Sequence, residues 1–338
     1  MAQIDRREFL NASVLAGAGL GLGLVRSPAL LATAAPSLSN AYSKAPRPQP
    51  PSPQPLASNP QPPALSIAHY KTSPAEPDGI VEEAKRLTRQ AVEALGGMNR
   101  FVSKGNVVWV KPDIGWDRRP EQAATTNPDV VATLVEMSYQ AGAKKVLVSD
   151  NPCNPARLSF PRSGIQQTAE KAGAEVIFLD ERKFRKMSIN GKVLKEWEVY
   201  RDVVEADRLI NIPIVKNHNL CLATLGMKNL MGVIGGPRNR LHQDLGGTLV
   251  DLAAFLKPRL VVLDAIRVLT ANGPVGGNLA DVKRKDVVVA GVDQVAADAL
   301  GATLLGYKPD AISYIAQGNA RGLGTINFNS LSPKQIEV

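Results

Sequence analysis

The sequence predicts an α/β fold, with a mostly parallel sheet covered by helices on both faces and a β-hairpin near residues 186–200. From residue 80 onward, short apolar runs of strand length alternate with longer segments whose apolar residues recur at helical spacing. The segment "RKMSINGKVLKEWEVY" interrupts this rhythm, and its Asn190-Gly191 pair between alternating residues predicts the hairpin.

The first half of the folded region predicts three strand and helix units. "GIVEEAKRLTRQAVEALGG" (79–97) has helical periodicity and a Gly-Gly stop, and the apolar run "NVVWVKP" (106–112) predicts a strand. A helix over 127–143 starts with Asn127 as N-cap and Pro128 at its first position. A strand at 144–150, a helix at 163–174 and a strand at 175–180 follow by the same periodicities.

The second half continues the alternation beyond the hairpin. "DRLINIPIV" (207–215), "RLVVLDAI" (259–266) and "KDVVVAG" (285–291) are short apolar runs and predict strands. "LGGTLVDLAAFLKP" (245–258) and "DQVAADALGATLLG" (293–306) have the length and spacing of helices. Alternation throughout predicts a single α/β domain over residues 66–338.

The first 65 residues have a different composition from this domain. Arg6 and Arg7 precede an apolar, Gly/Ala-rich stretch and the small-residue site Ala32-Thr33-Ala34, which predicts a twin-arginine export signal over residues 1–34. Residues 35–65 are proline-rich and predict an extended linker. We therefore expect the twin-arginine export machinery as a partner and a periplasmic or secreted protein that is exported folded.

Composition limits the partners and cofactors. The net charge of +9 is modest and aromatic residues make up only 5% of the chain, which argues against nucleic-acid binding. No apolar run follows the signal that is long enough to span a membrane, so we expect no transmembrane span in the mature chain. No C-x-x-C occurs, so an iron–sulfur cluster is not expected, while a divalent metal stays open.

The two cysteines, Cys153 and Cys221, each follow a predicted strand. We expect them near the same edge of the sheet, and whether they form a disulfide stays open.

Polar residues gather where the predicted strands end, and ligands of open α/β sheets bind beyond the carboxyl ends of the strands. Each could instead be an ordinary solvated loop residue or a helix cap. The residues at these ends are Lys111, Asp113, Asp150, Asn151, Asp180, Lys216, Asn217, His218, Asp264 and Asp293.

The segment "IVKNHNLCLATLGMKN" (214–229) is the richest in such groups. It is either a solvated loop after a buried strand or the floor of a site for a small anionic ligand. In the second case Lys216, Lys228 and Arg238 would hold a phosphate or carboxylate, together with backbone N–H groups of the glycines that follow, Gly232, Gly235 and Gly236.

The candidate site has three sets of residues. His218 and His242 are candidates for moving protons, with Asp264 as a third catalytic residue that orients a histidine. Candidate metal ligands are Asp150, His218 and Asp264. Candidate substrate-binding residues are Lys111, Lys216, Asn217, Lys228, Asn229, Arg238 and Asn272.

The order of motifs resembles the domain-of-unknown-function 362 family over about Ser66 to Gly324. The motifs are "VKP" (110–112), "VKNH" (215–218), "LGMKNLMGVIGG" (225–236), "LH" (241–242), "VVLDAI" (261–266), "NGPVGG" (272–277) and "GVDQVAADALGATLLG" (291–306). The family pattern matches Lys216, His218, Lys228, Asn229, His242, Asp264, Asn272, Gly273, Pro274, Asp293 and Asp298. A looser fold-level likeness to lactate racemase implies histidines that shuttle protons at a 2-hydroxy acid.

Three functions follow from these residues. The first is an exported enzyme, similar to an isomerase, epimerase or oxidoreductase, that acts on a small anionic substrate by histidine-mediated proton transfer. The second is a binding or cofactor-delivery protein that uses the same anion pocket without catalysis. The third is an envelope protein tethered by its linker. A pocket with both histidines within hydrogen-bond reach of one point would favour the enzyme, lysines without nearby acid–base groups would favour the binding protein, and charges dispersed over a convex surface would favour the third.

Overall fold

The computed structural model describes residues 62–71 and 79–338, and Pro62–Val338 form one compact unit. The predicted export signal, and the predicted linker up to residue 61, lie outside the described residues and stay predictions. Among the described helices, none is long and apolar enough to cross a membrane.

The strands are β1 (Leu65–His69), β2 (Val107–Pro112), β3 (Lys145–Val148), β4 (Glu175–Val176), β5 (Phe184–Ser188), β6 (Glu196–Tyr200), β7 (Arg208–Ile212), β8 (Ile214–His218), β9 (Leu222–Thr224), β10 (Leu260–Leu269), β11 (Val282–Gly291) and β12 (Lys334–Glu337). The α-helices are α2 (Gly79–Ala94), α3 (Pro128–Gln140), α4 (Ala156–Arg162), α5 (Ile165–Lys171), α6 (Arg201–Glu205), α7 (Gly226–Asn229), α8 (Leu245–Leu256), α9 (Gln294–Leu304) and α10 (Ser313–Ala320). The short 3₁₀ helices η5 (Arg238–Asp244) and η7 (Pro309–Ala311) lie near the site described below.

The central sheet has the strand order β12-β1-β11-β10-β7-β2-β3-β4, with β8 and β9 branching from β10. Neighbouring strands from β10 through β7, β2 and β3 to β4 are parallel, whereas β11 runs antiparallel to both β10 and β1. The predicted fold class, a mostly parallel sheet, is confirmed. The parallel strands bring the carboxyl ends of β2, β3 and β7 to one edge.

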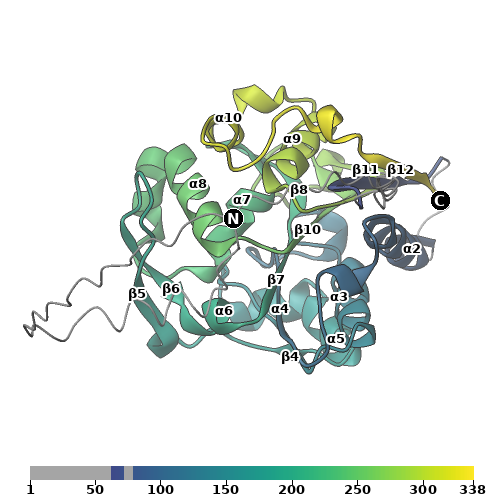
Figure 1. Ribbon diagram of the computed structural model, residues 1–338, viewed down its shortest axis with the longest axis horizontal. Helices are drawn as coiled ribbons and strands as arrows, with labels where there is room; N and C mark the ends of the chain where they lie inside the picture. Colours follow the sequence, from purple (N-terminus) through teal and green to yellow (C-terminus); the bar gives the residue numbers. More distant parts are fainter. Residues whose placement is uncertain (1–61, 72–78) are drawn as a thin grey trace, which may run out of the picture. The chain divides into compact units, whose positions relative to one another are not determined.

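Helices cover both faces of this sheet, as Figure 1 shows. One buried apolar layer joins α2, α3 and α5 to the sheet, and a second joins it to α8, α9 and α10. Asn127 caps α3 as predicted, since its side chain accepts a hydrogen bond from the N–H of Asp129 at 2.9 Å. The strand expected at 175–180 is only Glu175–Val176, because its partner β3 itself ends at Val148 and leaves nothing further to pair with.

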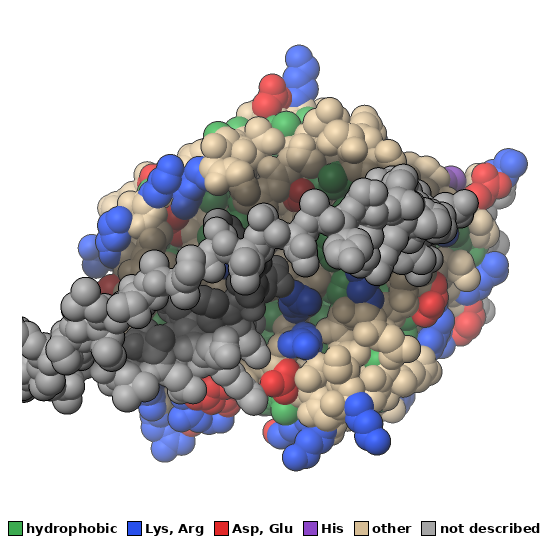
Figure 2. All heavy atoms as spheres, in the orientation of Figure 1, with side chains coloured by type: hydrophobic (Ala, Val, Ile, Leu, Met, Phe, Trp, Pro, Cys, Tyr) green, Lys and Arg blue, Asp and Glu red, His purple; other side chains and the backbone are tan. Residues whose placement is uncertain are grey.

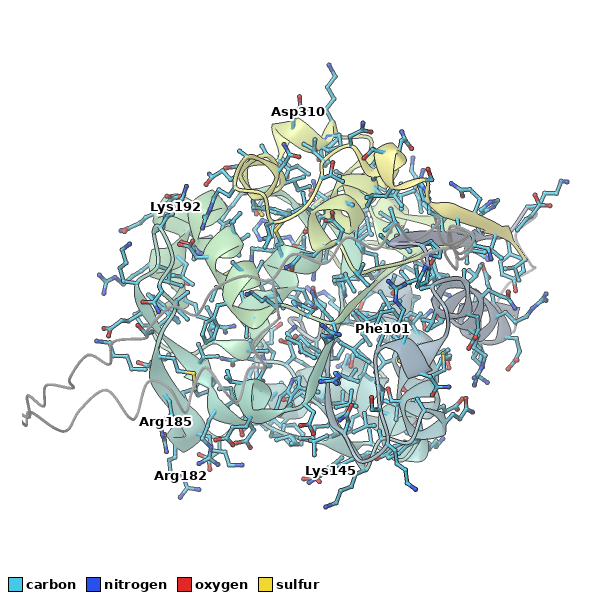
Figure 3. All side chains as sticks on the ribbon, in the orientation of Figure 1. Phe101, Lys145, Arg182, Arg185, Lys192 and Asp310 are labelled. Atoms are coloured by element: carbon cyan, nitrogen blue, oxygen red, sulfur yellow. The ribbon has the colours of Figure 1, made fainter. Side chains whose placement is uncertain are left out.

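The predicted hairpin is present as the antiparallel pair β5–β6. The carboxylate of Asp251 in α8 accepts hydrogen bonds from the N–H groups of Lys192, Val193 and Leu194, which fixes the hairpin turn against the helix. Figure 3 shows Arg185 and Lys192 at this side of the molecule, directed away from its body. The basic side chains of the hairpin are therefore surface groups.

Candidate functional site

A cavity of about 560 Å³ lies where β2 and β3 end and where the β8–β9 pair meets α7 and η5. Its charged lining consists of four cations and two carboxylates, Lys111, Lys216, Lys228, Arg238, Asp113 and Asp150, and His218 and His242 lie beside them. On the face drawn in Figure 2, Lys and Arg side chains are visible in the hollowed centre, set deeper than the charges of the rim. The formal charge of this lining favours an anion.

Strand alternation selects which residues of "VKNH" reach the cavity. Side chains two apart on a strand share a face, so Lys216 and His218 of β8 both line the cavity. Asn217 points to the opposite face, where its Nδ2 donates to the hydroxyl of Tyr307 at 3.0 Å and its Oδ1 accepts from the N–H of Gly273 at 3.1 Å. Asn217 thus anchors the 272–277 loop and is not part of the cavity lining.

Lys111 is completely enclosed and fully partnered. Its Nζ lies 2.9 Å from Oδ1 of Asp150 and donates to Oδ1 of Asn229 at 2.7 Å and to the carbonyl of Pro112 at 2.6 Å. Oδ2 of Asp150 in turn accepts from the N–H of Ile114 at 2.6 Å. Because all three N–H donors of the Lys111 ammonium group are used, Lys111 and Asn229 form the structural base of the cavity.

The residue that packs on this ion pair must be a glycine. A Cβ added at Gly232 would stand 1.8 Å from Oδ1 of Asp150 and 2.4 Å from Cε of Lys111, far inside contact distance. The N–H of Gly235 is not available to a ligand, because it donates to the carbonyl of Glu198 in the hairpin at 2.9 Å. Gly232 allows close packing on the ion pair, and the cradle of glycine N–H groups stays a prediction for Gly232 and Gly236.

Lys216 is also buried and paired. Its Nζ lies 2.9 Å from Oδ2 of Asp113 and donates to the carbonyl of Ala124 at 2.6 Å. Burial pushes the pKa of Asp113 upward, but the attraction of Lys216 and Lys111 outweighs this effect, so the pKa lies below its ordinary value. Asp113 is therefore ionised and neutralises Lys216.

Lys228 is different, because its Nζ makes no hydrogen bond or ion pair within the described part of the chain. Burial lowers the pKa of its ammonium group, and the opposing attraction of nearby groups, Asp113 among them, does not outweigh this effect. Asp298 of α9 holds this lysine in place, because its carboxylate accepts from the N–H groups of Gly226 at 2.6 Å and Met227 at 2.9 Å at the start of α7. The protein thus positions a half-buried cation that has no ion-pair partner among the described residues.

Two further polar groups complete this side of the cavity. The guanidinium of Arg238 donates to the carbonyls of Asn151 at 2.8 Å and Pro152 at 3.2 Å, and it contacts no carboxylate within the described residues. Oγ1 of Thr224 is buried and has no hydrogen-bond partner among the described residues. Thr224 lies opposite Lys216 in the β8–β9 register, so both side chains enter the cavity.

The hydrogen bonds of the two histidines give them opposite roles. Nδ1 of His218 accepts from the N–H of Leu220 at 3.1 Å, which places the ring proton on Nε2 and makes that nitrogen a donor. Burial, reinforced by Lys228 and Lys216, lowers the pKa of His218 to about 3, so the ring is neutral. Nδ1 of the exposed His242 lies 3.3 Å from the carbonyl of Asn239, and donation to that carbonyl leaves Nε2 as an acceptor.

Several predicted residues lie outside the cavity. Asp264 is fully buried in β10, where Oδ2 accepts from the N–H of Asn127 at 2.7 Å and Oδ1 from that of Ile266 at 3.1 Å. Burial raises the pKa of Asp264 to about 6. Asn272 is exposed and donates to Oδ2 of Asp281 at 2.9 Å. These contacts give Asp264 and Asn272 a structural role.

The three metal candidates, Asp150, His218 and Asp264, do not come together. No group of three or more His, Cys, Asp or Glu side chains suited to a metal ion occurs within residues 62–71 and 79–338. The remaining strand-end carboxylates serve as caps. Asp180 caps the turn that precedes β5, and Asp293 caps α9. The strand-end side chains that line the cavity come mainly from β2, β3 and β8.

Both cysteines lie close to this site as free thiols. Cys153 lines the cavity, and Cys221 lines a neighbouring cavity. The two cavities share Leu220 and His242 in their linings, so the cysteines lie near one another at this edge, as predicted. Burial raises the pKa of the Cys221 thiol to about 11, so it stays protonated.

The site also contains residues that sequence reasoning did not assign to it. Asp113 was visible at a strand end, but only its contact with Lys216 gives it a role. Trp116 comes from a loop and Asn239 from η5, and no sequence pattern places either of them at the cavity, whereas Leu220 lies in the 214–229 segment without having been singled out. Asp298 matched the family pattern, yet its role in holding α7 depends on contacts between distant segments.

The family model described as "Domain of unknown function (DUF362)" matches residues 108–303, which include the whole cavity lining. The thylakoid-associated protein of Synechocystis sp. is 27% identical over 262 residues, which cover 74% of this chain and 80% of that protein.

The apoprotein of lactate racemase from Thermoanaerobacterium thermosaccharolyticum is a structural neighbour with a TM-score of 0.43 and 13% identity. The match covers 70% of this chain and 56% of the racemase.

Proposed function

The chain belongs to the DUF362 family, and we propose that it is an enzyme that moves a proton on a small carboxylate or phosphate compound bound in this cavity. The observation that carries the proposal is the unpaired Lys228, which shares one cavity with two histidines of opposite hydrogen-bonding state. An ammonium group that is half withdrawn from water without an ion-pair partner is destabilising, so a chain selected for stability alone would gain by replacing it.

The anion would be held at the wall formed by Lys228, Arg238 and Thr224. The six charged groups of the lining carry two surplus positive charges, because Asp150 and Asp113 neutralise Lys111 and Lys216. A bound carboxylate or phosphate would supply the missing counter-charge to Lys228 and an acceptor for the hydroxyl of Thr224.

The histidines would divide the proton transfer between them. Nε2 of His242 is the accepting nitrogen and would remove a proton from the carbon beside the anionic group. The neutral His218 would donate its Nε2–H to the substrate oxygen on which negative charge develops, a role for which a neutral imidazole is suited. This pairing supports isomerase- or epimerase-like chemistry.

Two measurements on the full chain test the proposal. For binding, calorimetry with a panel of small carboxylates and phosphates should identify ligands whose Kd rises tenfold or more in Lys228→Met. The matched control is Lys144→Met, which removes an exposed lysine outside the cavity and should leave Kd unchanged.

For chemistry, the full chain is incubated with a bound ligand in D₂O. NMR should show that deuterium replaces the proton on the carbon beside the anionic group of the ligand. His242→Ala should lose this exchange while retaining ligand binding. Binding without exchange in the unmodified chain would identify an anion-binding protein without catalysis. A panel that does not bind, or that binds equally well to Lys228→Met, would refute the anion site.

A further inference from the structure

A second cavity of about 450 Å³ adjoins the first and shares two of its lining residues, Leu220 and His242. The proposed base His242 therefore stands at the junction of both cavities. The shared lining makes them two compartments of one site, separated by the tip of the β8–β9 hairpin, which contains Leu220.

The chemistry of the second cavity contrasts with that of the first. Its lining contains no lysine or arginine, and its one carboxylate, Asp244, is already engaged as the N-cap of α8, where it accepts from the N–H of Gly247 at 3.0 Å. Leucines, Ala311 and the ring of Tyr314 supply apolar surface, and Gln243 and Ser313 add uncharged polar groups. An anionic group would be disfavoured in this compartment, and an uncharged group with apolar parts would fit it.

The hairpin tip between the cavities exposes apolar surface without a partner among the described residues. Leu220 is 70% exposed, the largest value among the large hydrophobic side chains of the described chain, and Leu222 is 37% exposed. Leu222 also has a backbone φ of 67°, a left-handed conformation that is rare and costly for leucine. Exposed leucines on a strained turn at the junction of two cavities point to a ligand that covers them.

We propose that the substrate is an elongated anion, whose charged head binds at Lys228 in the first cavity and whose uncharged, mainly apolar extension occupies the second. This inference rests on the proposed function, because it uses the same anion site. It adds a substrate class, a carboxylate or phosphate with an acyl- or aryl-like extension, and it places the reacting carbon between the two cavities beside His242.

The test measures Kd of the full chain by calorimetry for straight-chain carboxylates from acetate to octanoate, with alkyl phosphates as a parallel series. Each methylene that enters the second cavity should tighten binding about threefold to fourfold, the effect of burying one methylene group. Ala311→Trp fills the second cavity from an exposed position and should abolish this gain for the longer members. Leu279→Trp, which adds the same side chain at an exposed position outside both cavities, should preserve it.

The outcomes separate the two proposals. A Kd that is independent of chain length, or a chain-length gain that survives Ala311→Trp, overturns the elongated substrate while the anion site stands. Absence of binding by every member, with Lys228→Met indistinguishable from the unmodified chain, overturns the anion site and the extension together.

Discussion

The two walls of the charged cavity use lysine in opposite ways. On the strand wall, Lys111 and Lys216 are enclosed and each lies 2.9 Å from an aspartate oxygen. On the helix wall, formed by α7 and η5, Lys228 and Arg238 face the same cavity without a carboxylate among the described residues. The comparison teaches that a cluster of basic residues is not one functional unit. Two of the four positive charges are neutralised by aspartates, and only the other two are available to a ligand.

The two walls are tied together through α7. Asn229, at the end of α7, accepts from Nζ of Lys111 at 2.7 Å and donates to the carbonyl of Lys111 at 3.1 Å and to Oδ1 of Asn211 at 2.8 Å. Asp298 holds the first residues of the same helix. Lys228 is therefore kept in place by the attachments of its neighbours and not by a counter-ion of its own.

The largest difference between the walls should appear when each loses a lysine. Lys111→Met leaves Asp150 buried without its cation, so we expect it to lower the free energy of unfolding by about 3–5 kcal/mol. Lys228→Met removes a cation that has no counter-ion and should leave stability unchanged or slightly raised. Urea denaturation of both variants measures the contrast, and equal losses would contradict the division of the cavity into paired and unpaired walls.

A smaller effect is expected at the attachment of the helix wall. Asp298→Asn keeps the size of the side chain but can accept from only one of the two N–H groups at the start of α7. The buried donor left unsatisfied should cost about 1–3 kcal/mol of stability and should weaken anion binding through displacement of Lys228. Asp293→Asn at the partly buried cap of α9 is the control, and it should destabilise without changing the Kd of the anion.

The third contrast is a pH dependence, which is absent near neutral pH and develops only below about pH 6.5. The pKa of His218 is about 3 in the folded protein and about 6.5 when unfolded, so between these values the unfolded state binds the extra proton. Stability from His218 is therefore present above about pH 6.5 and is lost as the pH falls, by at most about 1.4 kcal/mol per pH unit.

The variant His218→Asn isolates this contribution, because its side-chain oxygen can still accept from the N–H of Leu220. Asp264 and Asp298 act in the opposite direction, since burial raises their pKa values to about 6 and about 7, and their contribution is lost as the pH rises. The difference between the unmodified chain and His218→Asn, measured by denaturation from pH 7 to pH 4, should therefore shrink with decreasing pH. A constant difference would mean that His218 titrates normally.

Much of the fold could be predicted from local patterns. The helix starting at Asn127-Pro128 and the hairpin around Asn190 depend on capping and turn chemistry, which act over a few residues. The convergence of Lys216, His218, Lys228 and His242 on one cavity could also be predicted, because β8 delivers two of them with period 2 and the others follow within a short segment.

What the sequence by itself determined was the alternating architecture, the edge at which polar groups gather and the surplus of positive charge there. The tertiary structure alone decided which lysines are neutralised, that Asp264 turns into the sheet, and that a second cavity opens beside His242. The physical reason is the separation along the sequence over which each kind of interaction acts. Periodicity and capping act between neighbours in sequence, whereas ion pairing and cavity shape depend on distances of a few ångströms between side chains from distant segments, such as Lys216 and Asp113.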